Sequence, residues 1–591
     1  MELALPHSQS SPSSAAPHSI KGLDLSPVAP VFPSPADWRD EVIYELMIDR
    51  FDDNQEHPPF DMRAAKKKRE ARNAAVFQGG TIKGITRRLD YIQGLGATAI
   101  WMTPPLKNRQ DDPASYHGYG PQDFLSVDPR FGTLADLRDL VREAHSRGMY
   151  VIMDIVIDHV GDVWGYENDA DRVYDNGRKY EFGHWRESRT EDSSPSVSPI
   201  ELQYPDAFKR MGRMHDVGAA RGDEATDGDF MSLKVLDLEN PDVLKTIIAI
   251  YKYWIAATDI DGYRIDAFRH VRPDAGRAFC QAVREFATGI GKKNFILIGE
   301  VASRRGQLVK YVGNNTPLPR EGRRAHYPLL DAALDFPVYH KLARTLKGKL
   351  PVTRLFEHYQ WLARYYRDPA TAGKNYVTFF ENHDGGALNH ARILAGEKDV
   401  KLAILASAYV LLSMGIPCLY YGSEQGFDSA GKGDTAIREA MFGGTWGAFG
   451  TSGMHFFNPR HPVYQAISKL AQIRRAVPAL RYGRQFIRET SSDGIHFACP
   501  TTGQCTLAFC RILAADEVVI AMNLDREARN DCILVDPTQL PPGTVMHDLL
   551  GNSAPVWVEQ PAPDRTAFVR VALEGRGIVV LRKHSGDAPR A

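Results

Sequence analysis

The feature that most constrains this chain is a repeated unit of amphipathic helix, glycine, apolar strand and polar loop. In the clearest unit, Ile82, Ile85 and Leu89 mark one face of a helix, Gly96 can end it, and an apolar strand follows at 97–102. Strands that alternate with helices in this way predict βα units and a parallel sheet. Parallel strands are covered on both faces, which explains why these runs are almost continuously apolar.

The same unit recurs along most of the chain. Thr133 and Asp136 form an approximate capping box for a helix that Gly148 can end, and a strand follows at 150–156. All such segments together give eight predicted strands, at 42–48, 97–102, 150–156, 260–265, 294–298, 332–336, 376–380 and 417–421. Eight βα units close most naturally into a (β/α)8 TIM barrel. The alternative is a doubly wound open sheet, but that fold usually has a glycine-rich phosphate loop after its first strand, and the sequence has none there.

Changes in composition divide the chain into parts. Residues 1–36 are rich in Ser, Pro and Ala, which predicts a disordered or loosely ordered N-terminal tail. The barrel is assigned to 37–160 and 236–482, and the irregular polar segment 161–235 is predicted to be an insertion subdomain after the third strand. Strand-like runs separated by Gly and Pro at 483–591 predict a C-terminal antiparallel β-sandwich domain.

Charge and composition narrow the range of partners. The 591 residues carry a formal net charge of −1, which gives no reason to expect nucleic acid or an anionic membrane as a partner and suits an uncharged sugar. The six cysteines form no C-x-x-C pair, so free thiols are expected. The N-terminus does not resemble a signal peptide, and there is no apolar run of about eighteen residues. We therefore expect a cytoplasmic protein without a membrane span.

Charged residues follow the predicted strands at the carboxyl ends, where a barrel of this kind has its active site. The third strand leads to Asp154, Asp158 and His159, the fourth to Arg264, Asp266 and His270, the fifth to Glu300, and the seventh to His383 and Asp384. Arg264 and Asp266 stand two apart, so both point to one side of an extended strand. The arginine should keep the Asp266 carboxylate ionised, whereas the apolar run before Glu300 should raise the pKa of that carboxyl.

Paired carboxylates without a cysteine cluster or a phosphate loop favour glycosyl transfer. Asp266 then attacks the anomeric carbon, and Glu300, kept protonated, donates a proton to the leaving oxygen. Taken alone, Arg264 and Asp266 could equally be an ordinary buried ion pair. The convergence of several strand ends on one mouth favours the catalytic interpretation.

Five short motifs connect the chain to a known family. They read DIVIDH at 154–159, LDLENP at 236–241, GYRIDAFRH at 262–270, IGE at 298–300 and FENHD at 380–384. In this order they resemble the α-amylase family of glycoside hydrolases, family thirteen, and the resemblance runs from about Asp40 to the end of the chain. YHGY at 116–119 and DTAIR at 434–438 add to it. The resemblance implies an enzyme acting on α-1,4-glucans.

The resemblance also implies a role for each matched residue. Asp266 would be the nucleophile that forms a β-glycosyl-enzyme, Glu300 the general acid and then base, and Asp384 the residue that binds sugar hydroxyls and stabilises the transition state. Arg264 would position Asp266. The other matched residues would contact sugar: Tyr119 by stacking, His159 and His383 by hydrogen bonds, Asp434 and Arg438 at the next sugar, and Arg269 and His270 on the leaving-group side. Arg269 and His270 favour an α-1,4-glucan over sucrose or trehalose.

Calcium is left open by one departure from the family pattern. Many members have Asn where this chain has Asp158, and that Asn binds a structural calcium ion between barrel and insertion. Asp is also an oxygen ligand, so Asp158, Asp237 and the carbonyl of His270 could hold Ca²⁺. The alternative is that a Lys or Arg fills the site and pairs with Asp158. No organic cofactor is implied.

Three alternatives to α-1,4-glucan hydrolysis stay open on the sequence. A 4-α-glucanotransferase or other transglycosylase would share the covalent intermediate, and a sucrose- or trehalose-directed enzyme would share the family. An inactive partner subunit should lack at least one of the three carboxylates, and this chain has all three. No sequence feature indicates an oligomeric state.

Overall fold

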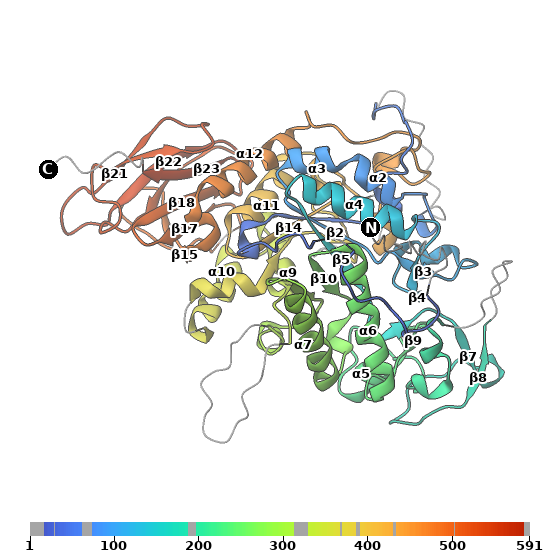
Figure 1. Cartoon of the computed structure of the whole chain (residues 1–591). Helices are drawn as coiled ribbons and strands as arrows, with labels where there is room; N and C mark the ends of the chain where they lie inside the picture. The colour runs from blue at the N-terminus through green and yellow to red at the C-terminus, as the bar shows by residue number, and fades with distance from the viewer. Residues whose placement is uncertain are drawn as a thin grey trace, which may run out of the picture.

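A computed structural model describes residues 17–28, 30–61, 74–186, 197–312, 329–366, 369–385, 391–429, 433–501 and 503–583. Its centre is a closed barrel of eight parallel strands (Figure 1). In chain order these are β1 (Ile43–Leu46), β2 (Ala99–Met102), β5 (Tyr150–Ile155), β10 (Gly262–Ile265), β11 (Ile296–Gly299), β12 (Ala332–Leu334), β13 (Tyr376–Thr378) and β14 (Ile416–Tyr420). Each lies within or overlaps one of the predicted strands, so the predicted TIM barrel is confirmed.

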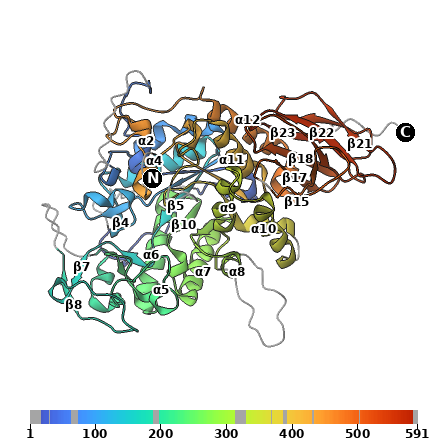
Figure 2. The same cartoon turned by 180° about the vertical axis from the view of Figure 1, so that it is seen from behind.

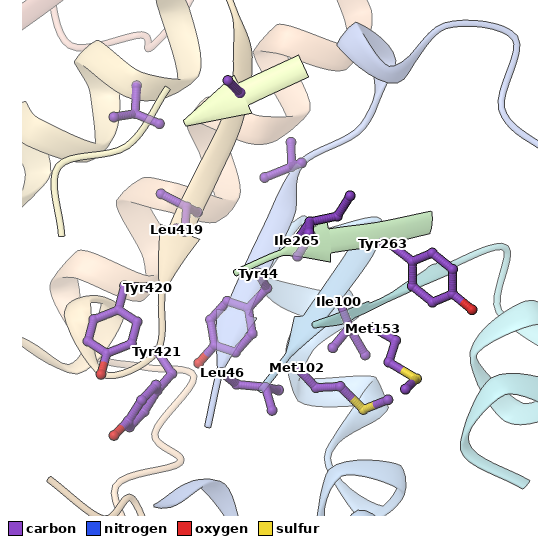
Figure 3. Close-up of a cluster of buried hydrophobic side chains, with 14 of the residues drawn as sticks. Tyr44, Leu46, Ile100, Met102, Met153, Tyr263, Ile265, Leu419, Tyr420 and Tyr421 are labelled. Atoms are coloured by element: carbon purple, nitrogen blue, oxygen red, sulfur yellow. The ribbon is translucent and has the colours of Figure 1, made fainter. Parts of the chain in front are cut away.

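Side chains of each barrel strand alternate between the interior and the helical layer, as a pleated strand requires. The outward set includes Tyr44, Leu46, Ile100, Met102, Met153, Tyr263 and Ile265, which gather in one buried cluster (Figure 3). The inward set includes Ile43, Trp101, Ile152 and Ile298, which form a separate core inside the barrel. The side chains of Glu45, Asp154 and Arg264 also point into the barrel. The strand registers place Glu45 beside Trp101 and Arg264 beside Asp154.

Helices cover the outside of the barrel. They are α2 (Ile82–Arg87), α3 (Leu89–Leu95), α4 (Leu134–Ser146), α6 (Pro241–Thr258), α7 (Pro273–Gly289), α9 (Phe336–Leu346), α10 (Val352–Tyr365), α11 (Lys401–Leu412) and α12 (Pro462–Ala476). The predicted signals hold: Gly96 ends α3 at φ 97°, and Thr133 with Asp136 makes a complete capping box on α4. The first predicted helix is broken into α2 and α3 at Arg88. Within the described ranges, no helix has the length and apolar character needed to cross a membrane.

The insertion leaves and rejoins the barrel through a short antiparallel pair. β6 (His159–Val160) follows β5 directly and pairs with β9 (Lys234–Val235), which precedes α6. Between them lie β7 (Trp164–Tyr166), β8 (Phe182–Trp185) and α5 (Asp223–Asp227). A smaller excursion after β2 carries β3 (Leu106–Asn108) and β4 (Pro121–Val127). Part of the predicted insertion, 187–196, lies outside the described residues.

The C-terminal part is an antiparallel sheet at the far end of the barrel from the insertion (Figures 1 and 2). Its strands are β15 (Arg484–Ile487), β16 (Thr490–Ser491), β17 (Thr506–Leu513), β18 (Asp516–Asn523), β19 (Arg529–Leu534), β20 (Val545–Asp548), β21 (Val556–Glu559), β22 (Phe568–Leu573) and β23 (Ile578–Lys583). A core of its own includes Val519, Val571 and Leu581. The predicted all-β C-terminal region is thus present, and α13 (Pro478–Tyr482) precedes it.

The described part of the predicted loose tail packs on the barrel, which differs from the sequence-based expectation. The Phe32 ring stacks on His145 at 4.1 Å between centroids, and its N–H donates to Asp259. Asn294 donates its side-chain N–H to the carbonyl of Pro35 at 2.8 Å. Ser and Pro composition concealed these contacts because each depends on a single apolar ring or backbone group. Residues 1–16 lie outside the described residues.

Candidate active site

Arg264 is the centre of the candidate site. Its side chain is fully buried at the end of β10. Nη1 donates to Oδ1 of Asp266 at 2.8 Å, and Nη2 donates to Oε2 of Glu300 at 2.8 Å. The guanidinium also contacts Asp154 of the neighbouring strand β5, with Nη1 3.0 Å from both carboxylate oxygens. Three predicted strand ends therefore meet on one planar cation, whose fixed fork suits several carboxylates at once.

The backbone after Asp266 is shaped to meet Glu300. Ala267 takes φ 49° and ψ 26°, a left-handed conformation that costs about 1–2 kcal/mol for a residue with a Cβ. In that conformation its N–H donates to Oε2 of Glu300 at 3.0 Å. The same oxygen thus receives two hydrogen bonds, from Arg264 and from Ala267. Backbone strain of this kind concentrates at functional sites.

The carboxyl of Asp266 is affected by burial and by the charges of Arg264 and Glu300. Burial raises the pKa of Asp266, the charge of Arg264 lowers it, and the charge of Glu300 raises it again, which leaves it well above the usual value. Arg264 favours the ionised form of Asp266, as expected, but burial and the charge of Glu300 act against it. A neighbouring carboxylate makes the ionised form of Asp266 less favourable. One acid and one carboxylate are the protonation state that glycosyl transfer requires.

Asp384 stands at the open side of this cluster. Its side chain is 38% exposed, whereas those of Asp266 and Glu300 are 13% and 18% exposed. Arg438 donates from Nη2 to Oδ1 of Asp384 at 3.2 Å, and Nη2 of Arg264 lies 3.9 Å from Oδ2. Burial opposes ionisation of Asp384, but His383 and Arg438 outweigh it and lower its pKa. Asp384 is therefore an accessible, ionised acceptor for hydroxyl groups.

Arg438 faces the site rather than the solvent. It is 7% exposed and donates from Nε to the carbonyl of His383 at 2.8 Å. Asp434, predicted to act with it, lies 4.0 Å from Nη2. Arg438 thus orients the segment that carries Asp384, and Asp434 lies at the rim.

Tyr119 lines the floor of the site, where its hydroxyl donates to Oδ2 of Asp154 at 2.8 Å and lies 2.7 Å from Nε2 of His383. The Tyr119 and His383 rings are stacked, with centroids 5.3 Å apart and planes inclined by 9°. Trp101 donates from its indole N–H to the same carboxylate oxygen of Asp154 at 3.0 Å. Asp154 is thus held by groups from three other segments.

His159 is placed beside Tyr119, but both of its ring nitrogens are occupied. Nδ1 lies 2.8 Å from Oδ1 of Asp158, and Nε2 lies 3.0 Å from the carbonyl of Tyr119. Both partners are acceptors, so both nitrogens carry hydrogen and the ring is cationic. The predicted hydrogen bond to sugar therefore requires one of these contacts to open.

Arg269 and His270 join the barrel to the insertion. Arg269 donates from Nη2 to the carbonyl of Ala220 at 2.7 Å. His270 donates from Nδ1 to the carbonyl of Ala225 at 2.6 Å, and its ring meets the edge of Phe230 at 4.5 Å. The pair therefore lies where the insertion approaches the carboxylates, in agreement with a position on one flank of the site.

The residues predicted to bind calcium do not fit an ion. The ammonium of Lys209 lies 2.9 Å from Oδ1 of Asp237 and also pairs with Glu239. Asp158 directs its own oxygen at His159. Calcium takes about six to eight oxygen ligands, and a positive charge among them excludes it. No three His, Cys, Asp or Glu side chains in the described segments are grouped to hold a metal. The predicted alternative of a basic residue fits better, with Asp237 rather than Asp158 as its partner.

Chemistry rather than cavity size identifies the site. A cavity of about 880 Å³ lies at the amino-terminal end of the barrel, lined by residues that include Pro35, Trp38 and Asn294. Active sites of this fold lie at the carboxyl ends of the strands. The clustered carboxylates lie at the carboxyl ends of the strands, whereas this cavity lies at their amino ends.

Sequence reasoning missed two residues of the site, Glu45 and Trp101. Both lie on strands whose apolar pattern hides them, at the inward positions of β1 and β2. The signal that could have found Glu45 is its position, because a charge at an inward site near a strand's carboxyl end needs a partner.

The comparisons with known proteins agree with this geometry. The sequence profile "Alpha amylase, catalytic domain" matches residues 46–443. An alpha-amylase of Streptomyces lividans is 34% identical over 461 residues, which cover 71% of this chain and 48% of the relative. A cyclomaltodextrin glucanotransferase of Geobacillus stearothermophilus is 26% identical over 527 residues, covering 86% of this chain and 63% of the relative. The chain thus spans about half the length of the first relative and under two thirds of the second.

Solved structures extend the likeness to nearly the whole chain. The crystal structure of an alpha-amylase from Geobacillus thermoleovorans, complexed with acarbose, superposes with a TM-score of 0.67 at 26% identity and covers 94% of this chain and 100% of that one. The motifs, the barrel and the profile match all lead to the same assignment. The chain belongs to the alpha-amylase family.

Proposed function

We propose that this chain is a retaining α-glycoside hydrolase that cleaves α-1,4-glucosidic bonds of starch, glycogen or maltooligosaccharides. The observation that carries the proposal is the shared guanidinium of Arg264, which holds Asp266 on one terminal nitrogen and Glu300 on the other. Two carboxyls on adjacent nitrogens of one cation face the same small volume. That arrangement suits a nucleophile and an acid acting on a single bond.

In the first step, a carboxylate oxygen of Asp266 attacks the anomeric carbon while the bond to the leaving sugar breaks. Glu300 gives its proton to the leaving oxygen, and a covalent β-glycosyl ester forms on Asp266. In the second step, Glu300 takes a proton from water as the water oxygen attacks the same carbon. The ester bond breaks, Asp266 leaves as a carboxylate, and Glu300 is protonated again. Two inversions retain the α configuration.

Asp384 and the surrounding charges stabilise the transition state. That state is oxocarbenium-like and carries positive charge on the sugar ring. Five carboxyls, those of Glu45, Asp154, Asp266, Glu300 and Asp384, surround the cations Arg264, His383 and Arg438. Asp384, whose pKa His383 and Arg438 lower, places a negative charge where the positive charge of the sugar ring develops. Asp384, the most exposed of the three predicted catalytic carboxyls, binds the sugar hydroxyls.

Three observations support an α-glucan as the substrate. Arg269 and His270, whose presence favours α-1,4-glucans by family resemblance, lie on the flank where the insertion meets the barrel. Proteins named alpha-amylases are among the similar sequences and folds. An uncharged polymer also agrees with the formal net charge of −1.

Transfer to a sugar hydroxyl is the second candidate, because the covalent intermediate reacts with water or with an acceptor sugar. Its support is the similarity to a cyclomaltodextrin glucanotransferase over 86% of this chain. The same residues serve both outcomes.

A product profile tests both candidates. The protein is incubated with soluble starch, maltoheptaose, sucrose and trehalose, and the products are separated by chromatography while NMR follows the anomeric configuration. Hydrolysis predicts shorter α-configured maltooligosaccharides from the first two substrates. Early products longer than maltoheptaose would show that the reaction is transfer rather than hydrolysis. Cleavage of sucrose or trehalose but not of the glucans would overturn the assignment of an α-glucan substrate. Asp266→Asn should abolish all activity, whereas Asp274→Asn, at a side chain that is 97% exposed, is the matched control.

A further inference from the structure

Glu45 is a buried carboxylate inside the barrel that the reaction described above does not use. It lies at an inward position of β1 and is 1% exposed. Oε1 lies 2.6 Å from Nδ1 of His383 and accepts the backbone N–H of the same residue at 3.2 Å. Oε2 is buried, and no hydrogen-bond partner for it is found among the described residues.

A purely structural role explains Glu45 poorly. Its neighbours on the flanking strands are Trp101 and Tyr420, and Cys418 lies nearby on β14. Burying a carboxylate in such surroundings costs several kcal/mol unless a partner compensates. An apolar residue would fill the same space at no such cost. Burial raises the pKa of Glu45, and the groups that oppose this are His383, through two hydrogen bonds and its charge, and Arg264 through its charge. His383 makes the larger contribution, so the purpose of Glu45 lies in what it does to that ring.

The ring of His383 bridges two carboxylates from different parts of the barrel. Nδ1 faces Glu45, while Nε2 lies 3.0 Å from Oδ2 of Asp384 and 2.7 Å from the hydroxyl of Tyr119. Ionised carboxylates only accept hydrogen bonds. Both ring nitrogens therefore carry hydrogen, and His383 is an imidazolium between Glu45 and Asp384.

We propose that Glu45 is a positioning residue for the reaction, because it fixes His383 as an imidazolium directed at Asp384 and so holds that carboxylate ionised and aligned at the sugar. The inference rests on the proposed function for the role of Asp384. The chain of contacts runs from the inward face of β1, through one ring, to the most exposed predicted catalytic carboxyl.

The other charged groups around His383 agree with this assignment. Burial disfavours the charged ring, but Asp384 and Glu45 outweigh it and raise the pKa of His383 to about 10. Arg438 contacts the His383 carbonyl and Asp384, and Arg264 lies 3.9 Å from Asp384. His117 is close by, but burial and Arg438 lower its pKa to about 3, so it adds no charge at neutral pH. Asp154, on the far side of the Tyr119 hydroxyl, adds a further negative charge.

The test is the substitution Glu45→Gln. Glutamine has nearly the same shape and keeps one oxygen that can accept from Nδ1 and from the backbone N–H of His383, but it carries no charge. Histidines labelled with ¹³C at Cε1 are titrated by NMR, and the His383 signal is assigned by its absence in His383→Asn. We expect His383 to stay cationic up to about pH 9 in the wild type and to titrate about 1–3 pH units lower in Glu45→Gln. On maltoheptaose, kcat should fall about tenfold with a smaller change in KM, and the loss should grow as the pH rises.

Glu517→Gln is the matched control, because Glu517 is a fully buried carboxylate of the C-terminal sheet that pairs with Arg488. It should change neither the His383 titration nor the pH profile. Melting curves separate misfolding from the effect sought, and Glu45→Asp, which restores the charge, should recover the pH profile in part. An unchanged His383 titration in Glu45→Gln, or superimposable pH profiles, would overturn the inference. Failure of the proposed function is a separate result, since the wild type would then cleave no glucan whatever the titration shows.

Discussion

The ammonium of Lys209 lies 2.9 Å from Oδ1 of Asp237 at the junction of the insertion and the barrel. A second ion pair crosses the junction in the opposite sense, from Arg272 of the barrel to Asp227 of the insertion, at 2.6 Å. Lys209 is also 3.6 Å from Asp227 and pairs with Glu239. Two basic side chains thus cross-link the segments that the family resemblance would join by a calcium ion.

This network predicts stability that does not depend on calcium. EDTA should leave the Tm of the wild type unchanged, and added CaCl2 should not raise it. Lys209→Met should lower the Tm by a few degrees, because the partly exposed carboxylates of Asp237 and Glu239 lose their shared cation, an effect of about 1 kcal/mol. Calcium should then recover part of the loss, since the carboxylates are freed. Lys179→Met, at an exposed lysine of the insertion, is the control. A fall in the wild-type Tm on adding EDTA would contradict the assignment.

Substitutions of Glu300 and Asp266 should differ in how their effect on the rate depends on the leaving group. Glu300→Gln should lower kcat on maltoheptaose by about 10²–10⁴-fold, because proton donation is lost. A glycosyl fluoride needs no proton in the first step, so kcat/KM for fluoride release should fall much less, although kcat still depends on Glu300 as the base of the second step. Asp266→Asn should lose about 10⁴-fold or more on both substrates. Steady-state kinetics on the two substrates measure this, and an equal loss for Glu300→Gln on both would refute the acid role.

Arg264→Lys should damage activity despite conserving charge. A single ammonium cannot hold Asp266 and Glu300 on separate nitrogens as the guanidinium does. We expect kcat to fall about 100-fold or more, because a misplacement of about 1 Å has that effect. Arg142→Lys, at a side chain that is 67% exposed, should be neutral. Near-normal kcat in Arg264→Lys would show that two-point binding is unnecessary.

The contact between barrel and C-terminal sheet should weaken in acid. Glu397 pairs with Arg576 at 2.6 Å, and although burial opposes ionisation, hydrogen bonds from Arg576 and from backbone N–H groups lower its pKa to about 2. A carboxyl with a lowered folded-state pKa adds stability above its unfolded value, and that stability is lost as the pH falls through the folded value. The Tm difference between wild type and Glu397→Gln should therefore be largest near neutral pH and shrink from about pH 5 to about pH 2. A difference that is constant across this range would disprove the charge effect.

Local periodicity was enough to predict the barrel and the grouping of charged residues at the carboxyl ends of its strands. The alternation of 3.6-residue and 2-residue patterns depends on neighbours in the chain, so each of the eight strands could be found from its own sequence. Asp266, Glu300 and Asp384 could be placed together because parallel strands present their carboxyl ends at one edge. The packing of Phe32 on His145 was missed because a single ring leaves no periodic signal.

The pairing of charged side chains could not be predicted from the sequence, because it depends on the closure of the barrel. Glu45 and His383 are 338 residues apart, and no pattern around either residue marks the other as its partner. Burial at the mouth of the barrel likewise raises the pKa of Asp266, although Arg264 lies beside it. Of the two open alternatives, the basic residue is the one found beside Asp237, because the insertion folds the Lys209 ammonium onto it. Strand and helix patterns arise from short-range sterics and burial, whereas charge pairing depends on which distant side chains the closed barrel brings within about 3 Å.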